Sequence, residues 1–250
     1  MNHDSPITYV DDLLLKTETT DHKAAVYFCY FPVSSYYMGL AGCLHREERQ
    51  YFDTLGSQKR KKSYLMGRYS AKTATCRLTN ENNFQNISIS QGIFGQPVIA
   101  CLFNHNIQVS ITHSNDIAAA IAFPEAVPMG IDVELPDPET TGVLESRTTD
   151  REKYLLRSIP LAYLDMLTLL WTVKESLSKA LRVGLMASYS IFEVGQIEEQ
   201  PNGVLCRFKN LPQFKTITFK LGAYLCTVAY PEQTDLRFDV EALQAVFQEV

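Results

Sequence analysis

Two acidic residues of the segment Gly130-Ile131-Asp132-Val133-Glu134 have the spacing of a chemical site. Side chains two apart on a β-strand point to the same face, so Asp132 and Glu134 would lie side by side while Ile131 and Val133 face a core. Neighbouring carboxylates repel each other, and a hard divalent ion bound by their oxygens relieves that repulsion. The alternative is a solvent-facing edge strand.

A second segment with chemical potential runs from Trp171 to Lys179, with the sequence WTVKESLSK. On a helix, Glu175 and Lys179 share a face because they are four residues apart, and Trp171 lies on the same side. The alternative is an ordinary surface ion pair, which contributes about 0.3–0.5 kcal/mol. Leucines at helical spacing are expected to form the buried face of this helix: Leu167, Leu170, Leu177 and Leu181.

Two further features point to an anionic ligand. Thr112-His113-Ser114 falls at a predicted hairpin turn, where a histidine flanked by hydroxyls could hold a phosphate. The alternative there is a lone surface histidine. The stretch from residue 57 to 80 contains no acid and indicates an anionic ligand or an acidic partner, or else a solvated helix face. Its cations are Lys59, Arg60, Lys61, Lys62, Arg68, Lys72 and Arg77.

The elements that would position these residues are predicted to occur twice along the chain. The first half is expected to contain a strand at 24–31, helices at 45–55 and 57–79, and strands at 87–90, 98–103, 107–112 and 117–123. The second half repeats this order with a strand at 129–135, helices at 149–158 and 161–182, and strands at 189–194, 204–209, 216–221 and 223–230. Matching elements lie roughly 105 residues apart, which indicates a structural duplication.

The boundary between the two halves is expected at 123–129, where Pro124 and Pro128 flank a short connector. This divides the chain into halves 1–125 and 126–250. Two α/β halves side by side leave a cleft between them, and such clefts commonly bind ligands.

Composition excludes several classes of protein. The 250 residues are 46% hydrophobic and 20% charged, which excludes wholesale disorder. The longest apolar run, 117–123, is far short of the roughly 18 residues of a membrane-spanning helix. No signal peptide is expected from the first twelve residues.

Charge, cysteines and missing motifs narrow the function further. The net charge of −5 speaks against a general nucleic-acid binder. Six scattered cysteines without a C-x-x-C pair indicate reduced thiols in a cytoplasmic protein rather than a zinc site. The chain lacks G-x-x-x-x-G-K-[ST], G-x-G-x-x-G, H-E-x-x-H and G-x-S-x-G, so P-loop hydrolysis, Rossmann redox chemistry and α/β-hydrolase catalysis are not expected.

Taken in order, these motifs resemble the signature of the 4′-phosphopantetheinyl transferases. The segment 130–134 is followed about 40 residues later by Trp171-x-x-Lys174-Glu175-Ser176-x-x-Lys179, and the two-half length resembles the Sfp-type, pseudo-dimeric branch. Residues 64–68, 95–97 and 112–114 resemble the family's first-half helix, G-K-P and S-H-S motifs. The sequence departs from the pattern at Gln96, where many members have lysine, at Thr112, where serine is usual, and at Ser110, where asparagine is common.

The resemblance implies an α/β (α+β) fold of two similar halves related by a pseudo-twofold axis. Each half would be a long helix packed on a small, mostly antiparallel sheet. Half 1–125 would carry the basic helix that binds coenzyme and carrier, and half 126–250 the metal-binding acids and the catalytic helix. Fused halves of this kind imply a monomer.

The resemblance also implies a reaction and its residues. Such enzymes transfer the 4′-phosphopantetheine arm of coenzyme A to a serine of an acyl or peptidyl carrier protein and release adenosine 3′,5′-bisphosphate. Asp132, Glu134 and Glu175 would hold Mg²⁺, with Mn²⁺ equally compatible, Glu175 would be the general base, and Lys179 would act on the departing phosphate. Coenzyme contacts would come from Lys59, Lys62, Arg68, Gln96, Thr112, His113 and Lys179. The partners would be coenzyme A and an apo-carrier protein, with no nucleic acid and no membrane.

Two other readings stay open at this point. The protein could be a non-catalytic module that binds coenzyme A or carrier proteins. It could also be a different metal-dependent nucleotidyl or phosphoryl transferase, which would turn over without adding mass to a carrier.

Overall fold

The computed structural model describes residues 5–101, 106–157, 159–184 and 188–250. In the first half, the strands are β1 (Ile7–Lys16), β2 (Asp21–Tyr30), β3 (Ile87–Gln91), β4 (Pro97–Cys101), β5 (Ile107–Ser114) and β6 (Ile117–Pro124). The helices there are α1 (Ser34–Gly39), α2 (Arg46–Thr54) and α3 (Gln58–Thr79), with short 3₁₀ turns at Leu40–Cys43 and Phe84–Asn86.

The second half repeats this pattern and adds to it. Its strands are β7 (Gly130–Glu134), β8 (Val194–Gln200), β9 (Gly203–Phe208), β10 (Phe214–Leu221), β11 (Tyr224–Pro231) and β12 (Asp235–Arg237). Its helices are α4 (Thr141–Ser146), α5 (Asp150–Leu156), α6 (Tyr163–Ala180) and α7 (Val240–Phe247), with 3₁₀ turns at Pro138–Thr140 and Tyr189–Phe192.

The sheets of the two halves share one strand order. Within the described residues, the first large sheet has the order β12-β1-β2-β6-β5, the second has β7-β11-β10-β9-β8, and β3 pairs with β4 alone. The series β2-β6-β5 followed by β4 and β3 therefore corresponds to β7-β11-β10 followed by β9 and β8. All these pairings are antiparallel, as the predicted mostly antiparallel α/β halves require.

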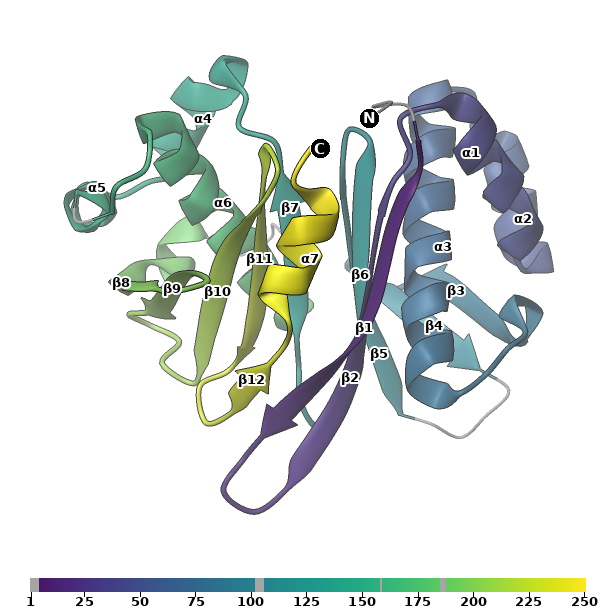
Figure 1. The fold of residues 1–250 in the computed structure, drawn as a ribbon, viewed down its shortest axis with the longest axis horizontal. Helices are drawn as coiled ribbons and strands as arrows, with labels where there is room; N and C mark the ends of the chain where they lie inside the picture. The colour runs from purple at the N-terminus through teal and green to yellow at the C-terminus, as the bar shows by residue number, and fades with distance from the viewer. Residues whose placement is uncertain (1–4, 102–105, 158, 185–187) are drawn as a thin grey trace.

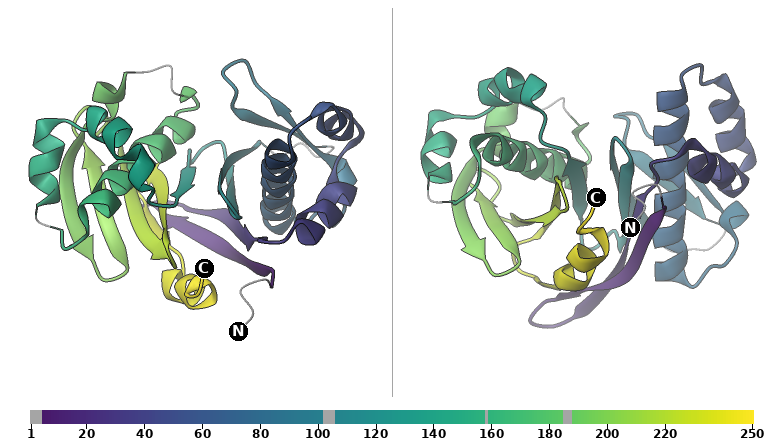
Figure 2. Two further views of the ribbon diagram at one scale, coloured as in Figure 1. Left: turned by 90° about the horizontal axis from the view of Figure 1, so that it is seen from above. Right: turned by 45° about the horizontal axis from the view of Figure 1, so that its top comes forward.

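The elements form layers, with the two large sheets face to face between the long helices (Figures 1 and 2). Helix α3 covers the outer face of the first sheet and α6 that of the second, while α7 lies between the sheets. Strand β6 is buried at every residue from Ile117 to Phe123 because both of its faces are covered. Its Ala118, Ala120 and Ala122 face α3, where small side chains allow a helix to approach closely.

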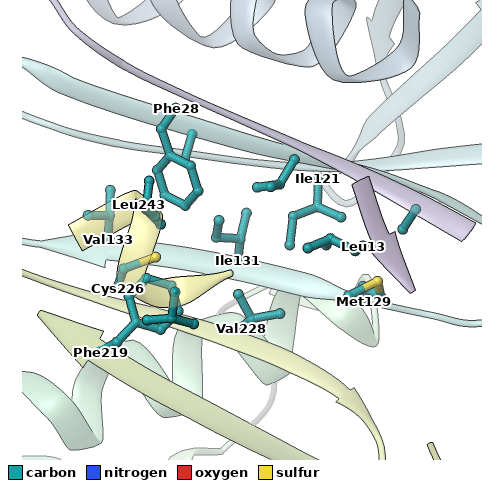
Figure 3. Packing of buried hydrophobic residues seen from close by; sticks show 14 of the residues in the cluster. Leu13, Phe28, Ile121, Met129, Ile131, Val133, Phe219, Cys226, Val228 and Leu243 are labelled. Atoms are coloured by element: carbon teal, nitrogen blue, oxygen red, sulfur yellow. The ribbon is translucent and has the colours of Figure 1, made fainter. Parts of the chain in front are cut away.

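The central core lies between the sheets and joins the two halves. Phe28 and Ile121 from the first sheet pack with Ile131 and Val228 from the second, and Leu243 of α7 completes the cluster (Figure 3). Each of these side chains is at most 2% exposed. The predicted inward orientation of Ile131 and Val133 is thus confirmed.

A buried ion pair braces the first half. The Glu48 carboxylate lies 2.6 Å from Lys72 Nζ of α3 and accepts the Ile89 N–H of β3 at 2.9 Å. It also accepts the His45 N–H and so caps α2. One carboxylate therefore fixes a short helix, the long helix and a strand at a single point.

The same brace recurs in the second half. Glu152 lies 2.8 Å from Lys174 Nζ of α6, accepts the Val194 N–H at 2.9 Å and caps α5 through the Thr149 N–H. The two braces support the predicted duplication beyond strand order. They also explain Lys174, whose ammonium group is buried in this pair.

The last residues of the chain cross back to the first half. Strand β12 pairs with β1 through Leu14, Leu15 and Lys16, and α7 buries Leu243 and Phe247 between the sheets. The division into halves 1–125 and 126–250 stays a prediction, and residues 235–250 contact both halves.

Several sequence expectations differ from the structure. The strand expected at 189–194 is wrong: a 3₁₀ turn occupies Tyr189–Phe192, and β8 starts at Val194. Strand β8 lies at a sheet edge and carries polar residues, so its pattern does not stand out. The hairpin turn is Asn115-Asp116, which places His113 and Ser114 on β5 rather than in the turn. Residues 102–103 of the expected strand 98–103 lie outside the described residues.

No helix of the described residues combines the length and apolarity needed to cross a membrane. The cysteines at positions 29, 43, 206 and 226 form no disulfide within the described residues.

Candidate functional site

The two halves meet along a row of hydroxyl groups on β5. Ser110, Thr112 and Ser114 alternate along that strand and accept the N–H groups of Ile131 (3.0 Å), Val133 (3.1 Å) and Leu135 (3.4 Å). These side-chain bonds take the place of a backbone ladder between β5 and β7, which belong to different sheets. We call these three residues the hydroxyl ladder.

The hydroxyl ladder also holds the two acids of β7. Thr112 Oγ1 donates to Asp132 Oδ1 at 3.0 Å, and Ser114 Oγ donates to Glu134 Oε2 at 3.1 Å. Asp132 is only 3% exposed, so the alternative of a solvent-facing edge strand does not describe it. The seam between the halves therefore fixes both carboxylates.

Helix α6 brings the remaining polar groups to the same place. Lys179 Nζ donates to Asp132 Oδ1 at 2.7 Å and to the Ile131 carbonyl at 3.2 Å, so its ion pair is with Asp132 rather than with Glu175. Gly130 allows α6 to come this close, because a Cβ at that position would overlap the Ser176 carbonyl oxygen and Ala180 nitrogen.

Burial and crowded charge change the acidity of two carboxyl groups. Burial, then the charge of Asp132, raises the pKa of Glu175 from 4.5 to about 7. The same two causes raise the pKa of Glu134, although its hydrogen bond from Ser114 opposes the change. Perturbed acids in a cleft are typical of functional sites.

The donor chemistry of these acids fits a hard cation. Asp132 Oδ2 and Glu175 Oε1 are buried oxygens for which the described residues offer no hydrogen-bond partner. Mg²⁺ at phosphate-transfer sites is commonly bound through one or two carboxylates together with substrate phosphates. In the described part of the chain, however, no three His, Cys, Asp or Glu side chains stand in an arrangement that could hold a metal ion. The three-carboxylate metal site therefore stays a prediction.

Three cavities meet around the acids. One of about 310 Å³ is lined by His113 together with the three acids, Trp171 and Lys179. A larger cavity of about 710 Å³ lies over α3 and shares His113 with the first. A third, of about 210 Å³, shares Glu175 and Lys179 with the first and reaches the β3–β4 hairpin. The three acids thus line a cavity that has neighbours on two sides, and His113 lines both of the two larger cavities.

The predicted cationic residues fall into two groups. Lys59 and Arg68 line the large cavity, and Arg68 also lies over the Tyr64 ring with its Cζ 4.7 Å from the centroid. Lys62, by contrast, pairs with Asp116 of the β5–β6 turn and lies over the Tyr37 ring. The structure therefore gives Lys62 a bracing position rather than a place on the cavity wall.

Two predicted polar contacts are already committed within the protein. Gln96 Oε1 accepts the Phe94 N–H at 3.0 Å and lines the smallest of the three cavities. Thr112 donates to Asp132 and accepts from Val133, which makes it part of the hydroxyl ladder.

Sequence reasoning missed three residues that line these cavities or pack against a residue that does. Arg60 lines the large cavity, and its place among the cations of residues 57–80 was the available signal. Tyr189 stacks on Trp171 with ring centroids 5.8 Å apart, and Arg147 Cζ lies 5.0 Å from the Trp171 centroid. These contacts join segments far apart in sequence, so no local pattern announces them.

Comparisons with known proteins bear on the half that contains the acids. The family model of the 4′-phosphopantetheinyl transferase superfamily matches residues 128–229, which include all three acids and Lys179. This agrees with the family that the motifs resemble.

Curated relatives within the superfamily match the same chain over a shorter length. The chain is 40% identical over 74 residues to a holo-[acyl-carrier-protein] synthase of Bacillus velezensis, covering 27% of this chain and 61% of the relative. It is 37% identical over 78 residues to that of Bacillus subtilis, covering 28% and 63%. The chain thus spans a little over three fifths of the relatives that it matches.

Solved structures of similar proteins overlap only in part. A holo-(acyl-carrier-protein) synthase from Bacillus anthracis, in complex with CoA (3′,5′-ADP), covers 44% of this chain and 96% of its own at 18% identity and a TM-score of 0.36. The Helicobacter pylori enzyme, in complex with coenzyme A, covers 46% and 97% at 16% identity and a TM-score of 0.25. Both overlaps are too weak to define the fold of this chain.

Proposed function

We propose that this protein transfers the 4′-phosphopantetheine arm of coenzyme A to a serine of an apo acyl or peptidyl carrier protein. The products would be the holo-carrier and adenosine 3′,5′-bisphosphate. The observation that carries the proposal is the meeting of Asp132, Glu134, Glu175, Lys179 and His113 around one cavity between the halves. Holo-[acyl-carrier-protein] synthases among the relatives support the same substrate pair.

The cavities suit a long substrate with phosphates near its middle. In this proposal, the nucleotide end of coenzyme A occupies the large cavity, where Lys59, Arg60 and Arg68 supply positive charge. His113, between that cavity and the acids, contacts a coenzyme phosphate. Gln96 contacts the coenzyme from the wall of the 210 Å³ cavity, and Thr112 does so from the wall of the 310 Å³ cavity. Lys62 contributes its charge only at long range because it is paired with Asp116.

Glu175 is the proposed general base. The carrier serine oxygen attacks the β-phosphorus, the bond to the bridging oxygen breaks, and the serine proton passes to Glu175. Without a bound ion, the pKa of Glu175 is about 7, which is well matched to this transfer at neutral pH. Lys179 keeps a positive charge beside the departing phosphate while its bond to Asp132 fixes its position.

Asp132, Glu134 and Glu175 would hold Mg²⁺, and Mn²⁺ is compatible with the same oxygens. When bound, the ion would neutralise phosphate charge that builds up in the transition state. The unpartnered oxygens of Asp132 and Glu175 support this part of the proposal. We further propose that the protein acts as a cytoplasmic monomer of the Sfp-type branch, since its two fused halves repeat one architecture.

A panel of apo-carriers, incubated with coenzyme A and Mg²⁺ and measured by intact-protein mass, tests this function. We expect a mass gain of one 4′-phosphopantetheine group on at least one carrier, and none with Glu175→Gln. Coenzyme consumption without mass gain would favour another phosphoryl or nucleotidyl transferase. Binding of coenzyme or carrier without any turnover would favour a non-catalytic module.

A further inference from the structure

Arg182, directly after helix α6, has a backbone conformation that residues other than glycine rarely adopt. Its φ is 60°, in the left-handed region. The other described non-glycine residues with positive φ are Asn80 and Asn115, and asparagine tolerates this region better than arginine does. Local bonds hold the turn: Arg182 N–H donates to the Lys179 carbonyl at 3.1 Å and Val183 N–H to the Ser178 carbonyl at 3.2 Å.

Strained conformations persist where the surrounding structure or the function of the side chain requires them. Glycine would end the helix here without strain. Arginine at this position therefore indicates a function for its side chain, which depends on the groups that the guanidinium can contact.

Arg182 lines the 210 Å³ cavity together with Glu175 and Lys179. Of the two cations on this wall, Lys179 is engaged by Asp132 and the Ile131 carbonyl. Arg182 forms no side-chain hydrogen bond or ion pair with any residue that the structure describes. The guanidinium is thus an uncommitted positive group beside the acid site.

The β3–β4 hairpin also lines this cavity, and none of its described lining residues is a cation. Gln96 there is uncharged, and its Oε1 accepts the Phe94 N–H. An anion that enters the cavity near Lys179 would therefore find Arg182 as the cation with donors still free among the described residues.

We propose that Arg182 is a substrate-binding residue whose guanidinium binds the diphosphate of coenzyme A, next to Lys179 and across the cavity from Gln96. This rests on the proposed function. Arginine suits the role because its planar fork binds phosphate oxygens through two hydrogen bonds at once and stays charged at every physiological pH.

Arg182→Gly gives two expectations that a structural role would not give together. Glycine relaxes the left-handed backbone, so we expect a thermal midpoint equal to or above that of the wild type. Loss of the guanidinium should weaken coenzyme A binding at least about tenfold in calorimetry at fixed ionic strength. Arg182→Asn, which keeps a side chain that tolerates positive φ, should show the same loss of affinity.

Two further variants sharpen the test. Arg157→Gln removes one positive charge from an exposed position at the end of α5 and should leave coenzyme A affinity within about twofold. Gln96→Lys in the Arg182→Gly background returns a cation to the same cavity from the opposite wall. It should recover most of the lost affinity.

Equal coenzyme A dissociation constants for wild type, Arg182→Gly and Arg182→Asn would overturn the assignment. A weakening accompanied by a lower thermal midpoint in Arg182→Gly, or matched by Arg157→Gln, would also overturn it. A wild-type protein that fails to bind coenzyme A at all would instead contradict the proposed function, so the two failures are distinct.

Discussion

At the scale of single residues, the main feature is a set of buried acids that lack hydrogen-bond partners for some of their oxygens. Lys179 and Thr112 donate hydrogen bonds to one oxygen of Asp132, while its other oxygen and one oxygen of Glu175 are buried without a partner in the described structure. Such groups cost free energy in the folded state. Acids of this kind in a cleft are typical of sites that bind a ligand or an ion.

The pH dependence of stability reports this cost. The pKa of Glu175 is 4.5 in the unfolded chain and about 7 in the folded protein. Between these two pH values the unfolded chain loses the proton and the folded protein keeps it, so the free energy of unfolding falls as pH rises from about 4.5 to about 7. Glu175→Gln removes that loss. Without added metal at pH 8, we expect the variant to be more stable than the wild type by about 1–3 kcal/mol, with no difference below about pH 4.

Urea denaturation at several pH values measures this difference. Glu199→Gln, at an exposed position on β8, is the matched control and should change stability by less than about 0.5 kcal/mol at every pH. A Glu175→Gln variant that is less stable than the wild type at pH 8 would mean that the Glu175 carboxylate is well compensated.

Lys179→Ala is expected to slow transfer more than it weakens coenzyme binding, so that kcat falls while KM changes little. It should also lower stability by about 2 kcal/mol because it leaves Asp132 buried without its cation. Lys209→Ala, which breaks an exposed pair with Glu193, is the control and should cost less than about 1 kcal/mol. A change confined to KM would limit Lys179 to substrate binding.

At the scale of elements, the hydroxyl ladder shows how two sheets can be joined without a shared backbone ladder. Strand β5 presents three hydroxyls at alternate positions, and β7 with the residue after it, Leu135, presents three N–H groups to them. The residues that join the halves are therefore the ones that orient Asp132 and Glu134. Positions that look like ligand contacts in the sequence serve as connectors in the fold.

Thr112→Val tests this dual role because valine keeps the shape and removes the hydroxyl. The Val133 N–H and one Asp132 bond would be lost at a buried site, so we expect about 2–3 kcal/mol of destabilisation together with a large fall in transfer. Thr112→Ser should restore both. The readouts are urea denaturation and the carrier mass assay.

The matched control is Thr75→Val, which removes an equally buried hydroxyl that donates within α3, to the Ala71 carbonyl. Its cost should stay near 1 kcal/mol with transfer unchanged. Thr112→Val with wild-type transfer rates would separate the ladder from the function of the acids.

Much of this element order could be predicted from the sequence, for reasons visible in particular segments. Helices α3 and α6 and strands β6, β7 and β11 follow strong periodic patterns, and residues 131–134 alternate as a half-buried strand must. Strand β1 was missed because Asp11 and Asp12 interrupt its apolar alternation. Helix α4 and strand β12 are too short to give a pattern.

The site was predictable only in its residue types. Strand alternation placed Asp132 and Glu134 on one face, but the partner of Lys179 and the bracing of Lys62 depend on contacts between distant segments. The left-handed turn at Arg182 could not be predicted either, because nothing in the local sequence indicates positive φ at an arginine.

At the scale of the whole molecule, both halves depend on one central core. Strands of both sheets and helix α7 contribute to it, so the inner face of each sheet is buried by residues of the other half (Figure 3). Residues 1–125 expressed alone would expose that face to water. The two halves of the sequence are therefore repeats in architecture, and we expect them to fold as one unit.

Leu243→Ala tests this dependence. Leu243 is fully buried between the sheets, so we expect a loss of about 2–5 kcal/mol in a single cooperative transition of the whole chain. The Val246 side chain on the same helix is 41% exposed, so Val246→Ala should cost less than about 1 kcal/mol of stability. Calorimetry measures the unfolding transition. Two separate transitions in Leu243→Ala would show that the halves fold independently.

The crossing of β12 to β1 has a consequence for how the protein is made. Strand β1 is synthesised more than 200 residues before β12 and α7, yet β1 and β12 pair in one sheet. The edge and inner face of the first sheet stay incomplete until residues 235–250 have left the ribosome. Until then, the nascent chain carries an exposed apolar surface of the kind that chaperones bind.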